Sequence, residues 1–427
     1  MVKYNFWFYV TRYILEYLLN TKNLKLRTLQ RMNFKYISKL AFSALSMALL
    51  YGKTHAQATI GNTQTNGSES NNIVTAVPFL LITPDARAGA MGDAGVAVAG
   101  DVNSASINAS KLAFLDKPYG FSVSYSPWLK SLVPDINLAY LSGFYKLDDR
   151  NTIGASLRYF SLGSIQLTDI NQQDLGISNP NELAFDVSFA RNFGEEFSLG
   201  TSVRYIYSNL ASGQFSSSGQ VHSGNALAVD VSGLYKTNTS MFGRQAILSA
   251  GANISNIGTK MSYSDGGQNF FLPTNLKLGG ASTIIVDDFS TITLALDFNK
   301  LLVPTQPIYD SNNNIVSGKD PNRSVPAGIF GSFSDAPGGF SEELKEVGIS
   351  TGLEYWYNQQ FAVRAGYNYQ SPMKGDSRYF TLGLGLKYNV FNIDFSYLLA
   401  NAQTSPLANT LRFGLLFNFG EKKAVKN

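Results

Sequence analysis

The chain has 427 residues, no cysteine, 13% aromatic residues and only 15% charged residues, against about 25% in typical soluble domains. The lack of cysteine excludes disulfide scaffolds, thiolate metal sites and cysteine nucleophiles. The formal charge of +4 is no sign of nucleic-acid binding, because residues 1–56 hold nine Lys/Arg against one acid and the remainder holds 25 Lys/Arg against 29 Asp/Glu.

The first 56 residues read as an N-terminal segment that ends in a signal peptide. A basic stretch precedes an apolar run over 40–50, and small residues then lead to a cleavage site after Ala56, so the mature chain is expected to begin at Gln57. We expect translation to start at Met32; the alternative is that the segment before it is a membrane anchor. The mature protein is therefore expected to leave the cytoplasm.

Two segments precede the first expected strand. Residues 57–75 are polar and rich in turn-forming residues, which is typical of a flexible leader. Residues 76–115 are rich in small residues, including Gly89, Gly92 and Gly95, and at first resemble a phosphate-binding loop. They precede a strand instead of following one, and the Lys-Ser/Thr pair of a P-loop is missing. We interpret them as a hatch, or plug, that lies inside a barrel.

Between residues 116 and 420 the sequence contains repeated runs in which apolar and polar residues alternate with a period of two, which predicts β-strands. "TITLALDF", for example, places Ile292, Leu294, Leu296 and Phe298 on one face. Most runs have 10–15 residues, as strands that cross a membrane obliquely require. Fourteen runs occur, near 117–127, 135–146, 151–162, 181–192, 195–209, 223–236, 245–255, 274–286, 289–301, 347–357, 360–370, 378–389, 390–399 and 410–420.

The connections between the runs alternate between short and long, with exceptions at 128–134, which is short for an outer loop, and 237–244, which is long for a turn. Tight periplasmic turns and large extracellular loops are the pattern of outer-membrane barrels. We therefore predict an all-β fold: a 14-stranded antiparallel transmembrane β-barrel of the outer membrane, with residues 421–427 as a periplasmic tail.

Eleven charged residues within the runs are out of phase with the apolar positions, so they are expected to face the barrel interior. A charge on the lipid face would cost about 2–4 kcal/mol for Arg or Lys at the membrane midplane. We expect these residues to form a lumen network of paired charges; the alternative is a charged binding site for a ligand headgroup. The predicted network comprises Arg158, Asp186, Arg204, Asp230, Lys277, Asp297, Glu354, Arg364, Lys387, Asp394 and Arg412.

A plug followed by fourteen strands resembles the FadL-type outer-membrane proteins, whose hatch ends in a motif of the form N-P-A-x-L. The matching residues here read "NASKL", from Asn108 to Leu112, with Ala109 in place of the usual proline. The segments "PDARAGAMGDAGVA", "YSPWLKSLVPDINLAYLSGFYKL" and "ASLRYFSLGSI" are similar to one branch, the PorV (LptO) family of the type IX secretion system of Bacteroidetes. The resemblance extends from about residue 76 to residue 420.

This resemblance implies a protein-transport role without catalysis. It implies that the barrel associates with the type IX translocon barrel, receives cargo by its C-terminal signal domain, and carries it to a surface attachment complex that contains a sortase-like protein. Outer-membrane lipid is the other expected partner, and nucleic acid is not expected. The alternative is a FadL-like transporter of fatty acids or other hydrophobic small molecules.

Cargo contact is expected on the long loops at 163–180, 210–222, 256–273 and 302–346. In the largest of them Ser341 is expected to cap a short helix with Glu342 and Glu343 in its first turn. That helix would be either a recognition element or a lid over the barrel mouth.

Trp128 and Leu129, between the first two runs, are candidate partner contacts, either as interfacial anchors or as a docking edge. No catalytic, cofactor or metal site is expected. The mature chain has a single histidine, His222, and its neighbour Ser223 would point to the opposite face of a strand, so the two cannot form a catalytic pair.

Overall fold

The computed structural model describes residues 70–129, 135–168, 171, 173–210, 215–216, 219–265, 267–400, 407 and 410–420. The predicted signal peptide, its cleavage site between Ala56 and Gln57, most of the expected leader and the tail at 421–427 lie outside the described residues.

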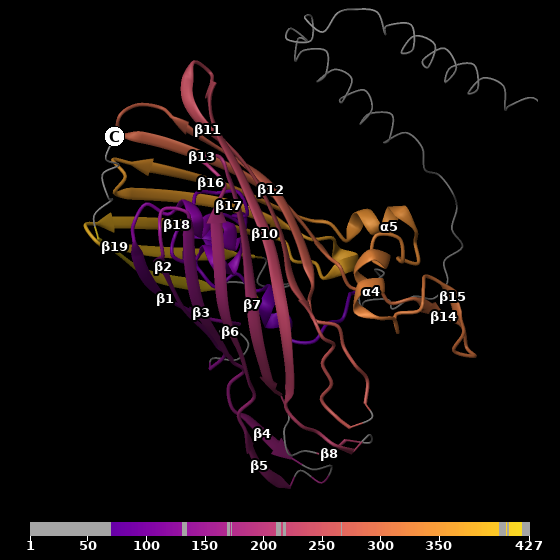
Figure 1. Ribbon diagram of the computed structural model, residues 1–427. Helices are drawn as coiled ribbons and strands as arrows, with labels where there is room; N and C mark the ends of the chain where they lie inside the picture. The colour runs from indigo at the N-terminus through magenta and orange to yellow at the C-terminus, as the bar shows by residue number, and fades with distance from the viewer. Residues whose placement is uncertain are drawn as a thin grey trace, which may run out of the picture. The chain divides into compact units, whose positions relative to one another are not determined.

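Fourteen antiparallel strands form a closed barrel, which confirms the predicted fold (Figure 1). The barrel closes where β1 pairs with β20, and Tyr119 lies opposite Tyr145 on one side and Phe419 on the other. The strands are β1 (Tyr119–Pro127), β2 (Asn137–Lys146), β3 (Asn151–Ser161), β6 (Asn181–Asn192), β7 (Phe197–Asn209), β10 (Gly224–Met241), β11 (Arg244–Gly258), β12 (Asn275–Ile285), β13 (Ser290–Leu301), β16 (Gly348–Tyr357), β17 (Phe361–Tyr369), β18 (Tyr379–Tyr388), β19 (Phe391–Leu399) and β20 (Leu411–Phe419).

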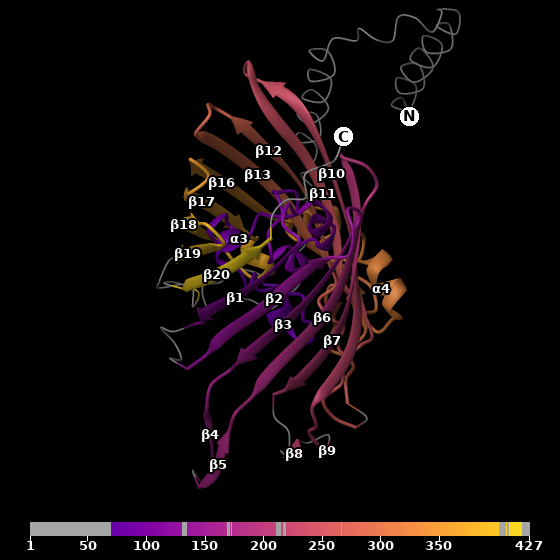
Figure 2. The same cartoon turned by 60° about the vertical axis from the view of Figure 1, so that its left-hand side comes forward.

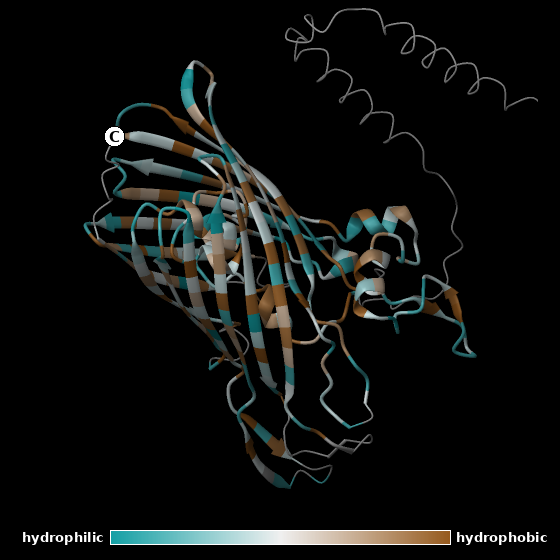
Figure 3. Cartoon of the chain, in the orientation of Figure 1, coloured by the Kyte–Doolittle hydropathy of each residue, from teal (hydrophilic) through white to brown (hydrophobic). Residues whose placement is uncertain are grey.

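Burial alternates along these strands with the period of two that the sequence predicted. In β7 the pattern is strict, with Val203 and Tyr205 exposed on the outside and Arg204 and Ile206 buried inside. Hydropathy alternates in the same way along the ribbons of the wall (Figure 3). The outer face is therefore apolar, as a lipid-facing wall requires.

Short connections lie at one end of the barrel, the turn end, and long ones at the other, the loop end. The turn expected at 237–244 is shorter than predicted, because β10 and β11 extend to Met241 and Arg244. Only Phe242 and Gly243 remain, with φ values of 55° and 75°, which is the geometry of a two-residue hairpin turn.

The loop end carries most of the additional structure. The described residues form three small hairpins there: β4 (Ile165–Thr168) with β5 (Asp174–Ser178), β8 (Phe215–Ser216) with β9 (Gly219–Gln220), and β14 (Ile308–Tyr309) with β15 (Ile315–Ser317). The loop between β13 and β16 also forms α4 (Val325–Gly331) and α5 (Phe340–Lys345). The predicted cap at Ser341 is wrong, because Gly339 is the N-cap of α5, two residues earlier, and Ser341 lies within the helix.

Residues 76–115, called the plug segment below, lie inside the ring of strands (Figure 2). They form four short helices: η2 (Pro78–Leu81), α3 (Ala86–Ala90), η3 (Ser104–Ser106) and η4 (Ala109–Phe114). A further short helix, η5 (Pro372–Lys374), lies in the loop between β17 and β18. None of the helices in the described part of the chain has the length and apolar character needed to cross a bilayer.

Candidate functional site

One cluster of inward-facing charges joins three neighbouring strands. Arg204 on β7 forms ion pairs with Asp186 on β6 and Asp230 on β10, at 2.5 and 3.1 Å. All three are at most 5% exposed. The backbone N–H of Asn256 also donates to Asp230 Oδ1 at 2.7 Å. Asp186 lies directly opposite Arg204 in the strand register, and Asp230 lies two residues from Ala228, which is the residue opposite Arg204 on β10. The three charges therefore pair across adjacent strands, one directly and one diagonally.

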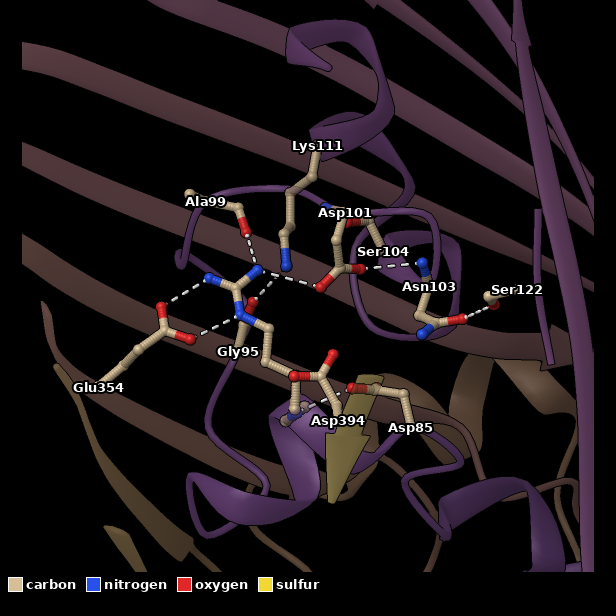
Figure 4. Close-up of polar contacts among 12 residues, drawn as sticks. Asp85, Gly95, Ala99, Asp101, Asn103, Ser104, Lys111, Ser122, Glu354 and Asp394 are labelled. Atoms are coloured by element: carbon tan, nitrogen blue, oxygen red, sulfur yellow. Dashed lines mark hydrogen bonds and ion pairs between the residues drawn. The ribbon is translucent and has the colours of Figure 1, made fainter. Parts of the chain in front are cut away.

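A second cluster links the wall to the plug segment (Figure 4). Arg364 on β17 lies between Glu354 on β16 and Asp394 on β19, with N–O distances of 2.7 and 2.6 Å. Arg87 of α3 approaches the same Glu354 carboxylate at 2.8 Å and pairs with Asp101 at 3.0 Å. Glu354 therefore receives one guanidinium from the wall and one from the plug segment.

Other wall charges hold the backbone of the plug segment. Asp297 on β13 is fully buried and accepts hydrogen bonds from the N–H groups of Gly95 and Val96, at 2.7 and 2.9 Å. Lys277 on β12 donates to the carbonyl of Asp93 at 3.0 Å. Arg158 on β3 donates to the carbonyl of Leu80 at 2.8 Å.

The last two predicted network members lie apart from these groups. Arg412 on β20 approaches Asp93 Oδ1 at 3.6 Å and stacks over the Trp128 ring at 5.7 Å. Lys387 on β18 is exposed and lines a cavity of about 470 Å³ at the turn end. Thus the eleven predicted residues all lie on the inner face, but only some pair with one another, and the rest anchor the plug segment or face the cavity.

The small residues of the plug segment fit close to the wall. Gly92 has a φ of 66°, and a Cβ there would lie 2.6 Å from the Tyr367 nitrogen. A Cβ on Gly89 would lie 2.3 Å from Arg412 Nη1 of the wall, whereas one on Gly95 would lie 3.1 Å from Ile107 of the plug segment itself. The wall also has a glycine where the plug segment approaches it closely. A Cβ on Gly366 of β17 would lie 2.1 Å from the Gly92 nitrogen.

Asn108, in the predicted hatch motif, is completely buried. Its amide donates to the carbonyls of Val96 and Gly233, at 2.8 and 3.1 Å, and its carbonyl accepts from the Ser110 N–H at 3.1 Å. Asn108 therefore caps η4 and ties the plug segment to β10.

A third cluster, at the loop end, was not predicted. Lys300 of β13 contacts Glu343 and Glu346, and Lys374 of η5 contacts Glu342 and Glu346. We call these five residues the outer cluster; all are at most 7% exposed. The sequence contains one indication of this cluster. Lys300 follows Phe298 at a spacing of two, so it occupies an outward-facing position, where a lysine requires a partner or cover.

The candidate partner contacts lie elsewhere than expected. Trp128 is 8% exposed and packs in a core with Phe79 and Phe160, and Leu129 packs against the same core. The sequence suggested that Trp128 is either an interfacial anchor or a docking edge. Neither role fits a buried side chain. Contacts with the plug segment remove it from the surface.

His222 lies on the surface at the loop end, with Nε2 3.6 Å from an Asp265 carboxylate that is itself fully exposed. Its Nδ1 lies 3.1 Å from the Ser223 carbonyl, so the contact involves the backbone and not the Ser223 hydroxyl. Within the described ranges no three His, Cys, Asp or Glu side chains gather as metal ligands do.

The comparison with known protein families identifies one family. The sequence model of the family described as "Type IX secretion system protein PorV" matches residues 65–308. No curated protein matches the sequence.

Among solved structures, the toluene transporter TodX of P. putida is 13% identical, with a TM-score of 0.46 over 79% of this chain and 99% of that one. The toluene transporter TbuX of Ralstonia pickettii is 13% identical, with a TM-score of 0.43 over 79% of this chain and 98% of that one. A FadL homologue of Pseudomonas aeruginosa is 11% identical, with a TM-score of 0.42 over 82% of this chain and 100% of that one.

Proposed function

The chain belongs to the PorV family of type IX secretion system proteins, and we propose that it binds secreted proteins by their C-terminal signal domain and carries them from the translocon to the surface attachment complex. The closed barrel with its apolar outer face is an outer-membrane β-barrel. The translocon barrel, the cargo signal domains and the attachment complex with its sortase-like protein are the proposed partners.

The observation that supports binding, as opposed to conduction, is the occupied lumen. The plug segment is anchored to the wall by Asp297, by Glu354 through Arg87, and by Asn108. Asp297 and Glu354 of the wall and Asn108 of the plug segment are each at most 1% exposed. A polypeptide passing through this barrel would have to displace all of them, whereas a polypeptide bound at the loop end would displace none.

The outer cluster supports the loop end as the binding face. Its buried ion pairs fix α5 and η5 against β13, so the largest loop presents a defined surface. A pre-organised surface loses less conformational freedom on binding. We also propose that the protein has no catalytic activity of its own.

The experiment compares a deletion strain with the complemented strain. Without the protein, cargo should remain in the periplasm with its signal domain attached, and the native protein should co-purify with such uncleaved cargo. Normal cargo maturation in the deletion strain would overturn the proposal. Reduced uptake of long-chain fatty acids with normal cargo maturation would favour the transporter alternative.

A further inference from the structure

The chain enters the barrel from the loop end. Asn71 donates from its backbone N–H to the Met373 carbonyl at 2.8 Å and from its side chain to Glu342 Oε1 at 2.9 Å. At the other end of the plug segment, the carbonyl of Leu115 accepts from Lys146 Nζ at 2.7 Å, and Lys146 ends β2 at the turn end. The segment therefore crosses the barrel from the outer mouth to the periplasmic side.

Residues 71–76 form a strap across the outer mouth. Asn71 and Ala76 are its fixed ends, because the N–H of Ala76 donates to the Phe271 carbonyl at 2.8 Å. Between them Asn72 and Val74 are exposed, whereas Ile73 and Thr75 are half-buried. This alternation is typical of an extended chain.

The backbone of the strap has open hydrogen-bonding groups. Among the described residues, none forms a hydrogen bond with the backbone of Asn72, Ile73, Val74 or Thr75. An extended chain with unpaired N–H and C=O groups is a template for a further strand.

Two cavities border the strap, and Val74 lines both. One, of about 600 Å³, is bounded by the loop between β11 and β12 and by the loop after β13. The other, of about 340 Å³, is bounded by the strap, the end of β13 and η5. Both have the size of ordinary ligand pockets.

The lining of the larger cavity suits an uncharged peptide. It combines apolar side chains with four amides, from Gln268, Asn269, Gln306 and Asn322, which can both donate and accept hydrogen bonds. Among the described residues that line it, only Lys260 and Asp320 are charged, and their charges are opposite. In the smaller cavity the charges of Lys374 and Glu346 pair with each other.

We propose that the strap is a docking edge at which an extended, uncharged segment of a partner polypeptide adds as a strand, with its side chains in the flanking cavities. The proposal rests on the proposed function, since the partner segment would belong to a cargo signal domain. It identifies the atoms that make the contact: the backbone N–H and C=O groups of residues 72–75.

Hydrogen exchange tests the proposal on the full-length protein in detergent, with and without a purified cargo signal domain as the probe. Strand addition should slow exchange at least tenfold at alternate amides within residues 72–75, while the amides of Asn71 and Ala76, which are already bonded, change little. Binding of the signal domain without slower exchange in this segment would overturn the docking edge and leave the proposed function intact. No binding of the signal domain at all would overturn both.

Two proline variants provide an independent test. In an extended chain the N–H groups of residues 73 and 74 point to opposite sides, so Ile73→Pro and Val74→Pro each remove a donor from a different edge. One variant should bind the signal domain at least tenfold more weakly, and the other should bind it as the wild type does. Equal effects of the two substitutions would overturn the proposal.

Discussion

Lys300 Nζ lies 2.9 Å from Glu343 Oε2, although Lys300 occupies an outward-facing position on β13, two residues after the exposed Phe298. The loop between β13 and β16 folds back over this end of the strand and buries the lysine, which is 7% exposed. The charge of Lys300 is thereby paired with two glutamates of the same loop. The pairing connects α5 and its C-cap residue Glu346 to the end of β13.

Replacing Lys300 with Gln should loosen the largest loop. The substitution leaves Glu343 and Glu346 buried with one fewer cation, and breaking a buried pair costs about 3–5 kcal/mol. Limited proteolysis should cleave within residues 302–347 sooner than in the wild type. Lys319→Gln, at an exposed lysine of the same loop, is the control and should leave the cleavage rate unchanged.

Replacing Arg204 with Gln should destabilise the barrel wall. Asp186 and Asp230 would remain buried without their shared guanidinium, again at a cost of about 3–5 kcal/mol. Heat-induced unfolding of the barrel, followed as the loss of the folded band on a semi-native gel, should occur at a lower temperature than in the wild type. Arg244→Gln, at an exposed position on β11, should not change it, and equal effects of the two substitutions would contradict the role of the cluster.

Replacing Asp297 with Ala should release the middle of the plug segment. The N–H groups of Gly95 and Val96 lose their acceptor, so their hydrogen exchange should accelerate at least tenfold. Ion conductance in planar bilayers should rise as the segment moves. Asp288→Ala, in an exposed turn, is the control, and unchanged exchange in both variants would show that other contacts suffice.

Replacing Gly366 with Ala should disturb the fit between wall and plug segment. The new methyl group would lie 2.1 Å from the Gly92 nitrogen and 2.2 Å from the Met91 carbonyl carbon, so the backbone must move. Unfolding should occur at a lower temperature and exchange around residue 92 should increase. In Gly280→Ala the nearest atom lies at 3.5 Å, and that variant should behave as the wild type.

The largest loop should also depend on pH through Asp335. Burial raises the pKa of the Asp335 carboxyl, and the Thr305 N–H and Arg323 lower it only in part. The folded loop binds the Asp335 proton more tightly than the unfolded chain does. The contribution of Asp335 to the stability of the loop is therefore largest below the pKa of the unfolded chain, near 3.8, and falls as the pH rises through the higher pKa of the folded loop. The difference in protease resistance between the wild type and Asp335→Asn should therefore change across this window, whereas a constant difference would contradict the shift.

The fold could be predicted from the sequence because strand alternation is a local property. A lipid-facing wall requires every second residue to be apolar, so the pattern around Ile292, Leu294 and Leu296 identifies both strand and face without knowledge of the partners. The inward direction of Arg204 and Asp297 follows from the same alternation.

The contacts of those side chains could not be predicted in this way. Asp297 accepts hydrogen bonds from Gly95 and Val96, about two hundred residues earlier in the chain, and only the path of the plug segment through the barrel brings them together. Trp128 lies in a loop and is buried for the same reason.

The sequence by itself determined the number of strands, the face each presents, and the alternation of turns and loops, because each depends on residues that are neighbours along the chain. Only the tertiary structure decided that Glu354 joins wall to plug segment, that Lys300 is covered by α5, and that the strap crosses the outer mouth. These depend on distances between residues remote in sequence, which the closure of the barrel fixes.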